Sequence, residues 1–399
     1  MANLQKKDIE TVDPIGKIRF CQEMHGFEGY KKYFWHCAAI LKLLILIGRT
    51  IYAYETLNEP KKVAELVATY PVRFMISIFQ AVCKMFALYS NRDKVAYFYN
   101  TVMYEFWDFH VAGSKIEQQA FKRFYFTNMI VLFQFILSMM CLALLILFPL
   151  VDMPEGVRPL PNIIWTPFDT NPSPLHEIIY VVMIWNLLLS ILGNAFYDIL
   201  YMYCVQHLLV QYMLLKELLR RLTQGIEHHR SDLERFNSQS FQSVVMERLK
   251  ICVEHHAKLL RFGRELERFC SRILTPQLFM SYAVLVINGY ILSVDHADFT
   301  KTTMLFNLTG SCMIQLAFYA IPASDLREQS ISVIDALENS DWYLFKSPLK
   351  RALVFVMMNT EKGITITAGG MANVDNEVLI AVVQKALSAI TLLRALIED

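Results

Sequence analysis

Residues 125–150 read YFTNMIVLFQFILSMMCLALLILFPL and contain no Asp, Glu, Lys or Arg. About 20 apolar residues are enough to cross a bilayer as an α-helix, so this stretch predicts a membrane span. Two further runs without these four residue types, 273–294 and 302–324, are also long enough. The whole chain of 399 residues is 55% hydrophobic and only 19% charged, whereas a soluble domain is about a quarter charged. The composition and the runs together predict an all-α polytopic membrane protein.

Four more segments complete a set of seven predicted spans. Residues 178–215 contain one acidic or basic residue apart from a histidine, and they would form about 57 Å of helix at 1.5 Å per residue. Because the hydrocarbon core is only about 30 Å thick, we expect this helix to continue beyond the membrane face. The other three segments each carry two basic residues and are weaker candidates: 33–54, 70–90 and 378–397.

The Lys and Arg content of the loops predicts their side of the membrane, since cytoplasmic flanks carry an excess of these residues. With seven spans, the N-terminal segment and every second loop after it hold 28 Lys and Arg, and the remaining loops and tail hold 4. We therefore expect a cytoplasmic N-terminus and an extracellular C-terminus. The predicted organisation is a cytosolic N-terminus (1–32), spans 1–4 with the fourth extended into the cytosol (33–215), a cytosolic helical loop (216–272), spans 5–6 (273–324), a second cytosolic segment (325–373) and a last helix (374–399).

No motif points to catalysis or to a bound cofactor, because phosphate-binding glycine loops and G-x-S-x-G are absent. The chain has two Glu-His-His runs, at 227–229 and 254–256. Adjacent histidines point about 100° apart on a helix, whereas two metal ligands on one face need a spacing of three or four. We interpret both runs as solvated helix faces. The net charge of +1 predicts no nucleic-acid partner. We expect no enzyme, no cofactor and no metal site.

Small and polar residues form a stripe along the last predicted span. Steps of three, four and seven residues keep its members on one helix face: Glu377, Gln384, Ser388, Thr391, Ala395 and Glu398. Such a stripe suits a water-filled pathway, and it suits close packing against a neighbouring helix equally well. The opposite face is apolar and consists of Leu379, Val382, Val383, Ala386, Leu387, Ile390 and Leu393.

A second polar stripe, Asn186, Ser190, Asn194 and Asp198, is spaced by four along span 4. It should face the bundle interior, because polar groups are costly in lipid. The outer halves of spans 2, 3, 4 and 6 are mostly apolar, which suits a small greasy ligand as well as plain helix packing. Residues at compatible depths give the candidate ligand contacts: Phe74, Ile78, Ser138, Met139, Leu142, Tyr180, Met183, Asn186, Leu187, Leu305 and Leu308.

Five short motifs follow span 6 in a fixed order. They are Arg327-Glu328-Gln329-Ser330, Asn339-Ser340-Asp341-Trp342-Tyr343, Lys350-Arg351, Ala368-Gly369, and Ser388 with Thr391-Leu392-Leu393-Arg394. In this order and spacing they resemble the insect odorant receptor family. Two positions depart from the family pattern, because Gly363-Ile364 replaces a Pro-Leu pair and Leu387-Ser388-Ala389 replaces aromatic-Ser-aromatic.

The resemblance implies a subunit of a heteromeric, ligand-gated, non-selective cation channel in the plasma membrane of olfactory neuron dendrites. Its partner would be the shared odorant receptor co-receptor, in a heterotetramer surrounded by membrane lipid, and its ligand a small volatile odorant. The chain is similar to a tuning subunit, because the loop between spans 4 and 5 lacks the co-receptor's long insert. Segment 325–373 would belong to a cytosolic anchor domain. The last helix would line the pore with Gln384, Ser388, Thr391, Leu392 and Ala395.

Three other classes remain as alternatives at this point. A gustatory receptor would be expected to carry Thr-Tyr-x-x-x-x-Gln in its last helix, whereas Thr391 is followed by Leu392. A G-protein-coupled receptor would need the opposite orientation. A secondary transporter would show internal repeats, and the chain has none that we detect.

Overall fold

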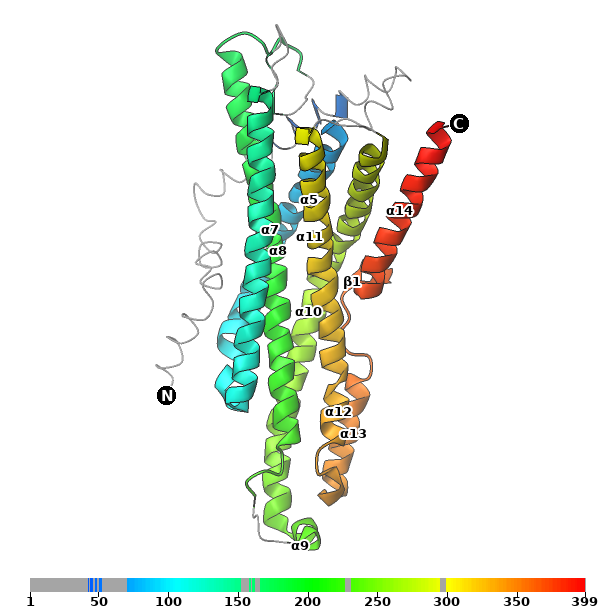
Figure 1. Ribbon diagram of the computed structural model, residues 1–399. Helices are drawn as coiled ribbons and strands as arrows, with labels where there is room; N and C mark the ends of the chain where they lie inside the picture. The colour runs from blue at the N-terminus through cyan, green and yellow to red at the C-terminus, as the bar shows by residue number, and fades with distance from the viewer. Residues whose placement is uncertain are drawn as a thin grey trace.

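The computed structural model is a long bundle of helices, with α14 at one edge (Figure 1). It describes residues 70–151, 166–226, 231–294 and 299–398, and scattered positions within 42–51 and 158–161. The long helices are α5 (Tyr70–Ser90), α7 (Ser114–Val151), α8 (Leu175–Arg220), α10 (Gln239–Val294), α11 (Phe299–Ile331), α13 (Ser347–Thr360) and α14 (Asn376–Glu398). Shorter elements are α6 (Arg92–Asn100), η1 (Thr101–Glu105), η2 (Phe109–Ala112), α9 (Asp232–Asn237), α12 (Val333–Glu338), η3 (Trp342–Leu344), β1 (Thr367–Ala368) and β2 (Ala372–Asn373).

Five helices within the described residues are long and apolar enough to cross a membrane, namely α7, α8, α10, α11 and α14. They contain predicted spans 3 to 7. Span 2 corresponds to α5, whose apolar stretch is the shorter Ile76–Ser90. Most of span 1 lies outside the described residues. The prediction of an all-α multi-pass membrane protein is confirmed, whereas the count of seven spans and the orientation of the termini stay predictions.

Two helices are far longer than the bilayer requires. α8 has 46 residues and α10 has 56, which correspond to about 69 Å and 84 Å at 1.5 Å per residue. In α10 the charged residues end at Arg272, and the rest of the helix is the charge-free run 273–294. The helix therefore divides into a polar half and a membrane half. Figure 1 places α9, α12 and α13 toward the end of the bundle opposite the C-terminus, beside the polar half.

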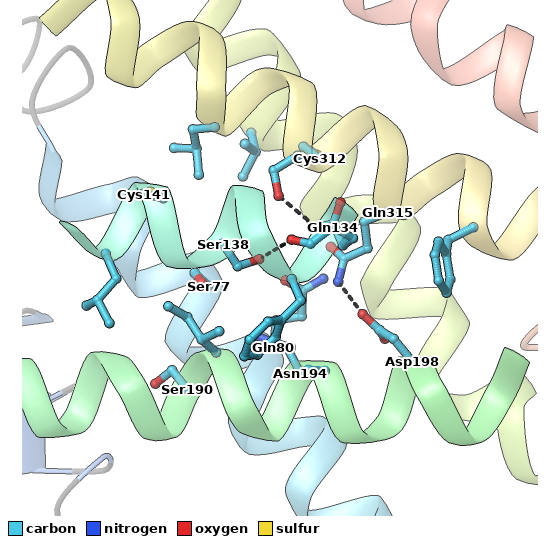
Figure 2. Close-up of a pocket in the computed structure, with 18 of the residues that line it drawn as sticks. Ser77, Gln80, Gln134, Ser138, Cys141, Ser190, Asn194, Asp198, Cys312 and Gln315 are labelled. Atoms are coloured by element: carbon cyan, nitrogen blue, oxygen red, sulfur yellow. Dashed lines mark hydrogen bonds between the residues drawn. The ribbon is translucent and has the colours of Figure 1, made fainter. Parts of the chain in front are cut away.

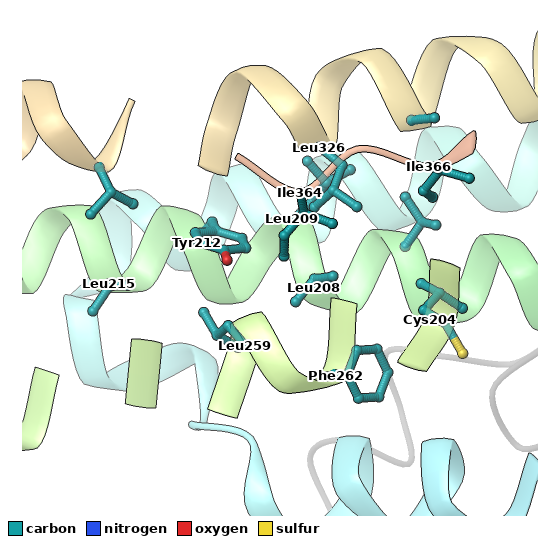
Figure 3. Packing of buried hydrophobic residues seen from close by; sticks show 14 of the residues in the cluster. Cys204, Leu208, Leu209, Tyr212, Leu215, Leu259, Phe262, Leu326, Ile364 and Ile366 are labelled. Carbon is teal, nitrogen blue, oxygen red and sulfur yellow. The ribbon is translucent and has the colours of Figure 1, made fainter. Parts of the chain in front are cut away.

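A hydrophobic core holds the polar halves of these helices together (Figure 3). Leu208 and Tyr212 of α8 pack in the same cluster as Phe262 of α10 and Leu326 of α11, and all four are fully buried. Ile364, in the segment after α13, belongs to the same cluster. Burial of such side chains contributes roughly 25 cal/mol per Å² of apolar surface, so this cluster stabilises the packing of the polar halves on one another.

The interpretation of residues 254–256 as a solvated helix face is wrong. His255 and His256 are only 3% and 4% exposed. The His255 ring stacks on Trp107 with centroids 3.6 Å apart, and its Nε2 lies 2.9 Å from Gln211 Oε1. Gln211 uses its other amide atom to donate to the Trp107 carbonyl, so its oxygen must accept from a neutral Nε2–H imidazole. Burial, and secondarily the charge of Lys258, holds the pKa of His255 at about 3.

The other Glu-His-His run, 227–229, lies outside the described residues. Within the described part of the chain, no group of three or more His, Cys, Asp or Glu side chains could hold a metal ion.

A short β-hairpin, with two residues in each strand, joins the polar part of the bundle to α14. β1 and β2 pair antiparallel, with Thr367 opposite Asn373. Gly369 and Gly370 form the turn with φ of +62° and +72°, a conformation that side chains with a Cβ rarely adopt. The Gly369 N–H donates to the Ser271 carbonyl of α10 at 3.1 Å, which attaches the hairpin to α10 just before α14 begins.

Candidate functional site

A cavity of about 370 Å³ lies among α5, α7, α8, α10 and α11 (Figure 2). Five of the predicted ligand contacts line it, namely Ile78, Ser138, Leu142, Leu187 and Leu308. They come from α5, α7, α8 and α11, so the structure brings these four helices around one space. The volume is at the lower end of the range of small-molecule pockets, about 300–1,000 Å³.

Other predicted contacts do not line this cavity. The Tyr180 hydroxyl donates to the Ile146 carbonyl at 2.8 Å and thereby joins α8 to α7. Met183 and Leu305 are 4% and 2% exposed and are buried by packing, and the Asn186 amide is buried without a partner for its nitrogen among the described residues. Met139 packs against the small apolar cluster of Leu142, Leu145 and Leu187. The side chain of Phe74 lies outside the described part of the chain.

The cavity has a polar end that the sequence analysis did not assign to the site. Gln80, Gln134, Asn194, Asp198 and Gln315 line it together with apolar side chains. Asn194 and Asp198 belong to the predicted stripe of span 4, and they face the bundle interior as expected: Asp198 is buried, and Asn194 is half-buried with its Oδ1 fully enclosed. Gln134 and Gln315 are the only glutamines of the two charge-free runs 125–150 and 302–324, and this was the signal that could have found them.

A buried ion pair closes the polar end. Lys84 Nζ lies 2.7 Å from Asp198 Oδ1, and the Lys84 side chain has no exposed surface. The same carboxylate accepts from the Tyr319 hydroxyl and, at 2.9 Å, from Gln315 Nε2. The ammonium also lies 5.4 Å from the centre of the Tyr319 ring. Lys84 of α5 and two side chains of α11 all donate to this carboxylate of α8. The carboxylate therefore ties three helices together at the polar end of the cavity.

Lys42, in predicted span 1, also has a partner. It is fully buried, and its Nζ donates to Ser190 Oγ of α8 at 3.0 Å. Arg49, seven residues later, lies outside the described residues.

The polar stripe of α14 faces away from the rest of its own chain. Gln384, Ser388, Thr391 and Ala395 are all exposed, whereas Ala386 on the opposite face is 4% exposed. That opposite face packs on α10 and α11, but very few residues in the apolar part of α14 are fully buried. Leu387 and Leu393 depart from the predicted pattern, because they are 59% and 36% exposed although they were placed on the packed face.

The two hydroxyls of the stripe donate within the helix. Ser388 Oγ donates to the Gln384 carbonyl at 3.0 Å, and Thr391 Oγ1 donates to the Ser388 carbonyl at 2.8 Å. Their hydrogens are used in this way, so the oxygen lone pairs remain available on the exposed face.

The family model described as 7tm Odorant receptor matches residues 63–387, which is most of the chain. The chain belongs to the odorant receptor family. This family is a receptor family and no enzyme class, and the match favours it over the gustatory, G-protein-coupled and transporter alternatives.

Curated relatives of this odorant receptor are distant. Odorant receptor Or2 of Anopheles gambiae is 19% identical over 61% of this chain and 61% of its own length. Odorant receptor 82a of Drosophila melanogaster is 23% identical over 60% and 58%. The chain thus spans about three fifths of the length of these relatives.

The odorant receptor fold is also found among solved structures. The insect olfactory receptor OR5 from Machilis hrabei superposes with a TM-score of 0.77 at 14% identity, over 92% of this chain and 89% of that one. The same receptor in complex with eugenol gives a TM-score of 0.77 at 15% identity, over 92% and 90%. At these identities the likeness establishes the fold.

Proposed function

We propose that this odorant receptor is the odorant-tuning subunit of a ligand-gated, non-selective cation channel in the plasma membrane, assembled as a heteromer with the odorant receptor co-receptor. The observation that carries the proposal is the direction of the α14 stripe. Gln384, Ser388 and Thr391 point away from their own bundle on a helix that is apolar enough to span a membrane. Polar side chains facing lipid are unfavourable, so a water-filled pore or another subunit must cover them.

A pore fits this stripe better than a dry interface. From Gln384 to Ala395 the side chains of the stripe carry no charge, and its hydroxyl oxygens present lone pairs that attract cations weakly without trapping them. Leu392 is 62% exposed and lies near the outer end beside the stripe. A ring that includes such a side chain would close the path by dewetting. Ala395 lies one turn beyond Thr391, and its small side chain would leave the outer mouth of the pore wide.

The cavity between α5, α7, α8, α10 and α11 is the proposed odorant site. Its apolar end holds Ile78, Leu142, Leu187 and Leu308, which suits a small volatile molecule. The solved receptor OR5, which shares the fold, has been captured with eugenol, a small aromatic molecule. The other predicted contacts would then shape the outer approach to the cavity: Phe74, Met139, Tyr180, Met183 and Leu305. Asn186 would support the walls of this approach.

Trp342 and Tyr343 give the proposed subunit interface its anchors. They are 45% and 54% exposed beside α13, whose Phe355 and Met358 are 65% and 70% exposed. Large exposed aromatic side chains of this kind dominate the binding energy of interfaces. We assign this surface to contact with the co-receptor in the cytosolic anchor region.

Currents from cells that express the receptor with the co-receptor test the proposal. Single cysteines are introduced on α14, and a charged thiol reagent is added during odorant application. Reagent should change the current through variants at positions 384, 388 and 391 and leave variants at 386 and 390 unaffected, because the second pair packs on the bundle. Absence of any odorant-evoked current despite surface expression, or modification of positions 386 and 390 alone, would contradict the proposal.

A further inference from the structure

The polar end of the cavity has a surplus of hydrogen-bond acceptors. Gln80, Gln134 and Asn194 point into this end from α5, α7 and α8 (Figure 2). The Oε1 of Gln134 and the Oδ1 of Asn194 are buried and have no hydrogen-bond partner among the described residues. Buried polar atoms are nearly always paired, because an unpaired one has lost its hydrogen bonds to water without replacement. These oxygens therefore point to a missing donor.

The direction of a chain of amides adds a third acceptor. Asp198 is a carboxylate and only accepts, so Gln315 must turn its Nε2 toward it, at 2.9 Å. Gln315 Oε1 then accepts from Gln277 Nε2 at 3.1 Å, and Gln277 Oε1 accepts from Gln80 Nε2. The ion pair thus fixes the orientation of every amide in the chain. Gln80 Oε1 is the acceptor at the end of this chain, on a half-buried side chain.

The cavity is amphipathic along its length. Leu187 precedes Asn194 in α8, whereas Gln134 precedes Leu142 and Leu145 in the antiparallel α7, and all of them line the cavity. Both helices therefore place the polar end toward the same side. In the predicted topology that side is the cytosolic one, so a ligand would enter with its polar group leading and keep its hydrocarbon in the outer part.

We propose that the ligand of this receptor is a small amphiphile with a hydroxyl group, an aliphatic alcohol or a phenol, whose hydroxyl donates its one hydrogen to the carbonyl oxygen of Gln134 or of Asn194 at the polar end. This rests on the proposed odorant-binding function. Ethers, esters, aldehydes and ketones only accept, so they leave these oxygens unpaired. A hydroxyl also accepts, so it pairs with a side-chain amide turned either way.

An alkylammonium ion is the other donor to consider. Asp198, the one carboxylate among the described residues that line the cavity, already accepts from Lys84, Tyr319 and Gln315. An ammonium ion would thus lose its hydration without gaining a counter-ion, which strongly disfavours it. The neutral hydroxyl has no such penalty.

The test measures currents from the receptor with the co-receptor, using probes matched in skeleton. Each alcohol is compared with the isosteric methyl ether and with the alkane of equal heavy-atom count, for a linear, a branched and a benzenoid skeleton. The octanol set is octanol, heptyl methyl ether and nonane. For the skeleton that fits, the alcohol should have a half-maximal concentration about tenfold or more below that of its ether, because the ether leaves one more carbonyl oxygen unpaired.

Two variants identify the acceptors. Because the hydroxyl donates to one of the two oxygens, at least one of Gln134→Leu and Asn194→Leu should raise the half-maximal concentration of the best alcohol about fivefold or more and leave that of its ether unchanged or lower. Leu142→Val, in the apolar end, is the control and should shift both probes alike. If a variant does not reach the cell surface, the comparison of alcohol and ether on the unsubstituted receptor still decides.

The outcomes separate the two proposals. No current with any odorant, despite surface expression, refutes the proposed function. If ethers or alkanes activate the receptor at half-maximal concentrations equal to or below those of the matched alcohols, the hydroxyl ligand is refuted and the proposed function stands. Water would then fill the polar end.

Discussion

Replacing Lys84 by methionine should destabilise the receptor strongly. Lys84 is completely buried, and its Nζ lies 2.7 Å from the Asp198 carboxylate, whose side chain is 12% exposed. Methionine keeps the length of the side chain and removes the charge. Asp198 would then hold its negative charge against only the Tyr319 hydroxyl and the Gln315 amide. Breaking a buried pair in this way is unfavourable by about 3–5 kcal/mol, since it leaves an uncompensated charge.

Lys94→Met is the matched control. Lys94 lies in the adjacent helix α6, and its Nζ is 3.4 Å from Glu265 Oε2. The two side chains are 39% and 29% exposed. Exposed pairs contribute about 0–1 kcal/mol, so this variant should resemble the unsubstituted receptor. The expected difference between the variants is at least about 2 kcal/mol, or roughly thirtyfold in the ratio of folded to unfolded protein.

Thermal loss of monodisperse receptor in detergent, together with surface labelling of cells, measures this difference. Lys84→Met should lower the midpoint temperature and the surface signal, and Lys84→Met with Asp198→Asn should recover part of both by removing the unpaired charge. Equal midpoints for Lys84→Met and Lys94→Met, or a double variant no more stable than Lys84→Met alone, would refute the reasoning.

Three further predictions concern other parts of the molecule. Gly289→Ala should disturb the packing of α14, since the new Cβ would lie 2.3 Å from Ile390 Cδ1. Ile390→Val removes that atom and should relieve the clash. If the effects of the two substitutions on the half-maximal odorant concentration are strictly additive, the clash is not the cause. Stability should fall as the pH drops from about 6.5 toward 3, because burial holds the pKa of His255 at about 3, below its value of 6.5 in the unfolded chain, and protons therefore favour unfolding. His255→Asn should reduce this slope, which is at most about 1.4 kcal/mol per pH unit, and an unchanged midpoint-versus-pH curve would count against the buried neutral ring. Trp342→Ala should reduce co-purification of the co-receptor, whereas Phe168→Ala, equally exposed at 51% but in the loop before α8, should not.

The membrane class and the long helices could be predicted because the signals are local in sequence. A charge-free run such as 125–150 must be shielded from water wherever it lies in the fold, and it must satisfy its backbone within one helix. The stripe on α14 was predictable for the same reason. Its spacing of three and four fixes one helix face, and the structure places that face opposite the packed side.

The sequence did not determine which side of a helix is buried when the helix continues beyond the membrane. His255 follows charged and apolar residues in a pattern that also suits an exposed face, and it is buried because Trp107 and Gln211, more than forty positions away in sequence, lie against it. The reading as a solvated face failed for that reason.

The depth and polarity of the cavity were decided by tertiary structure alone. Hydropathy placed Tyr180 and Ser138 among the candidate contacts, but only the positions of α7 and α8 make the Tyr180 hydroxyl bond to Ile146 while Ser138 lines the cavity. Lys84 and Asp198 are separated by more than a hundred positions and pair because α5 packs on α8. Hydropathy and helical period describe one helix at a time, whereas a cavity and a buried ion pair depend on which helices are neighbours and at what relative height they pack.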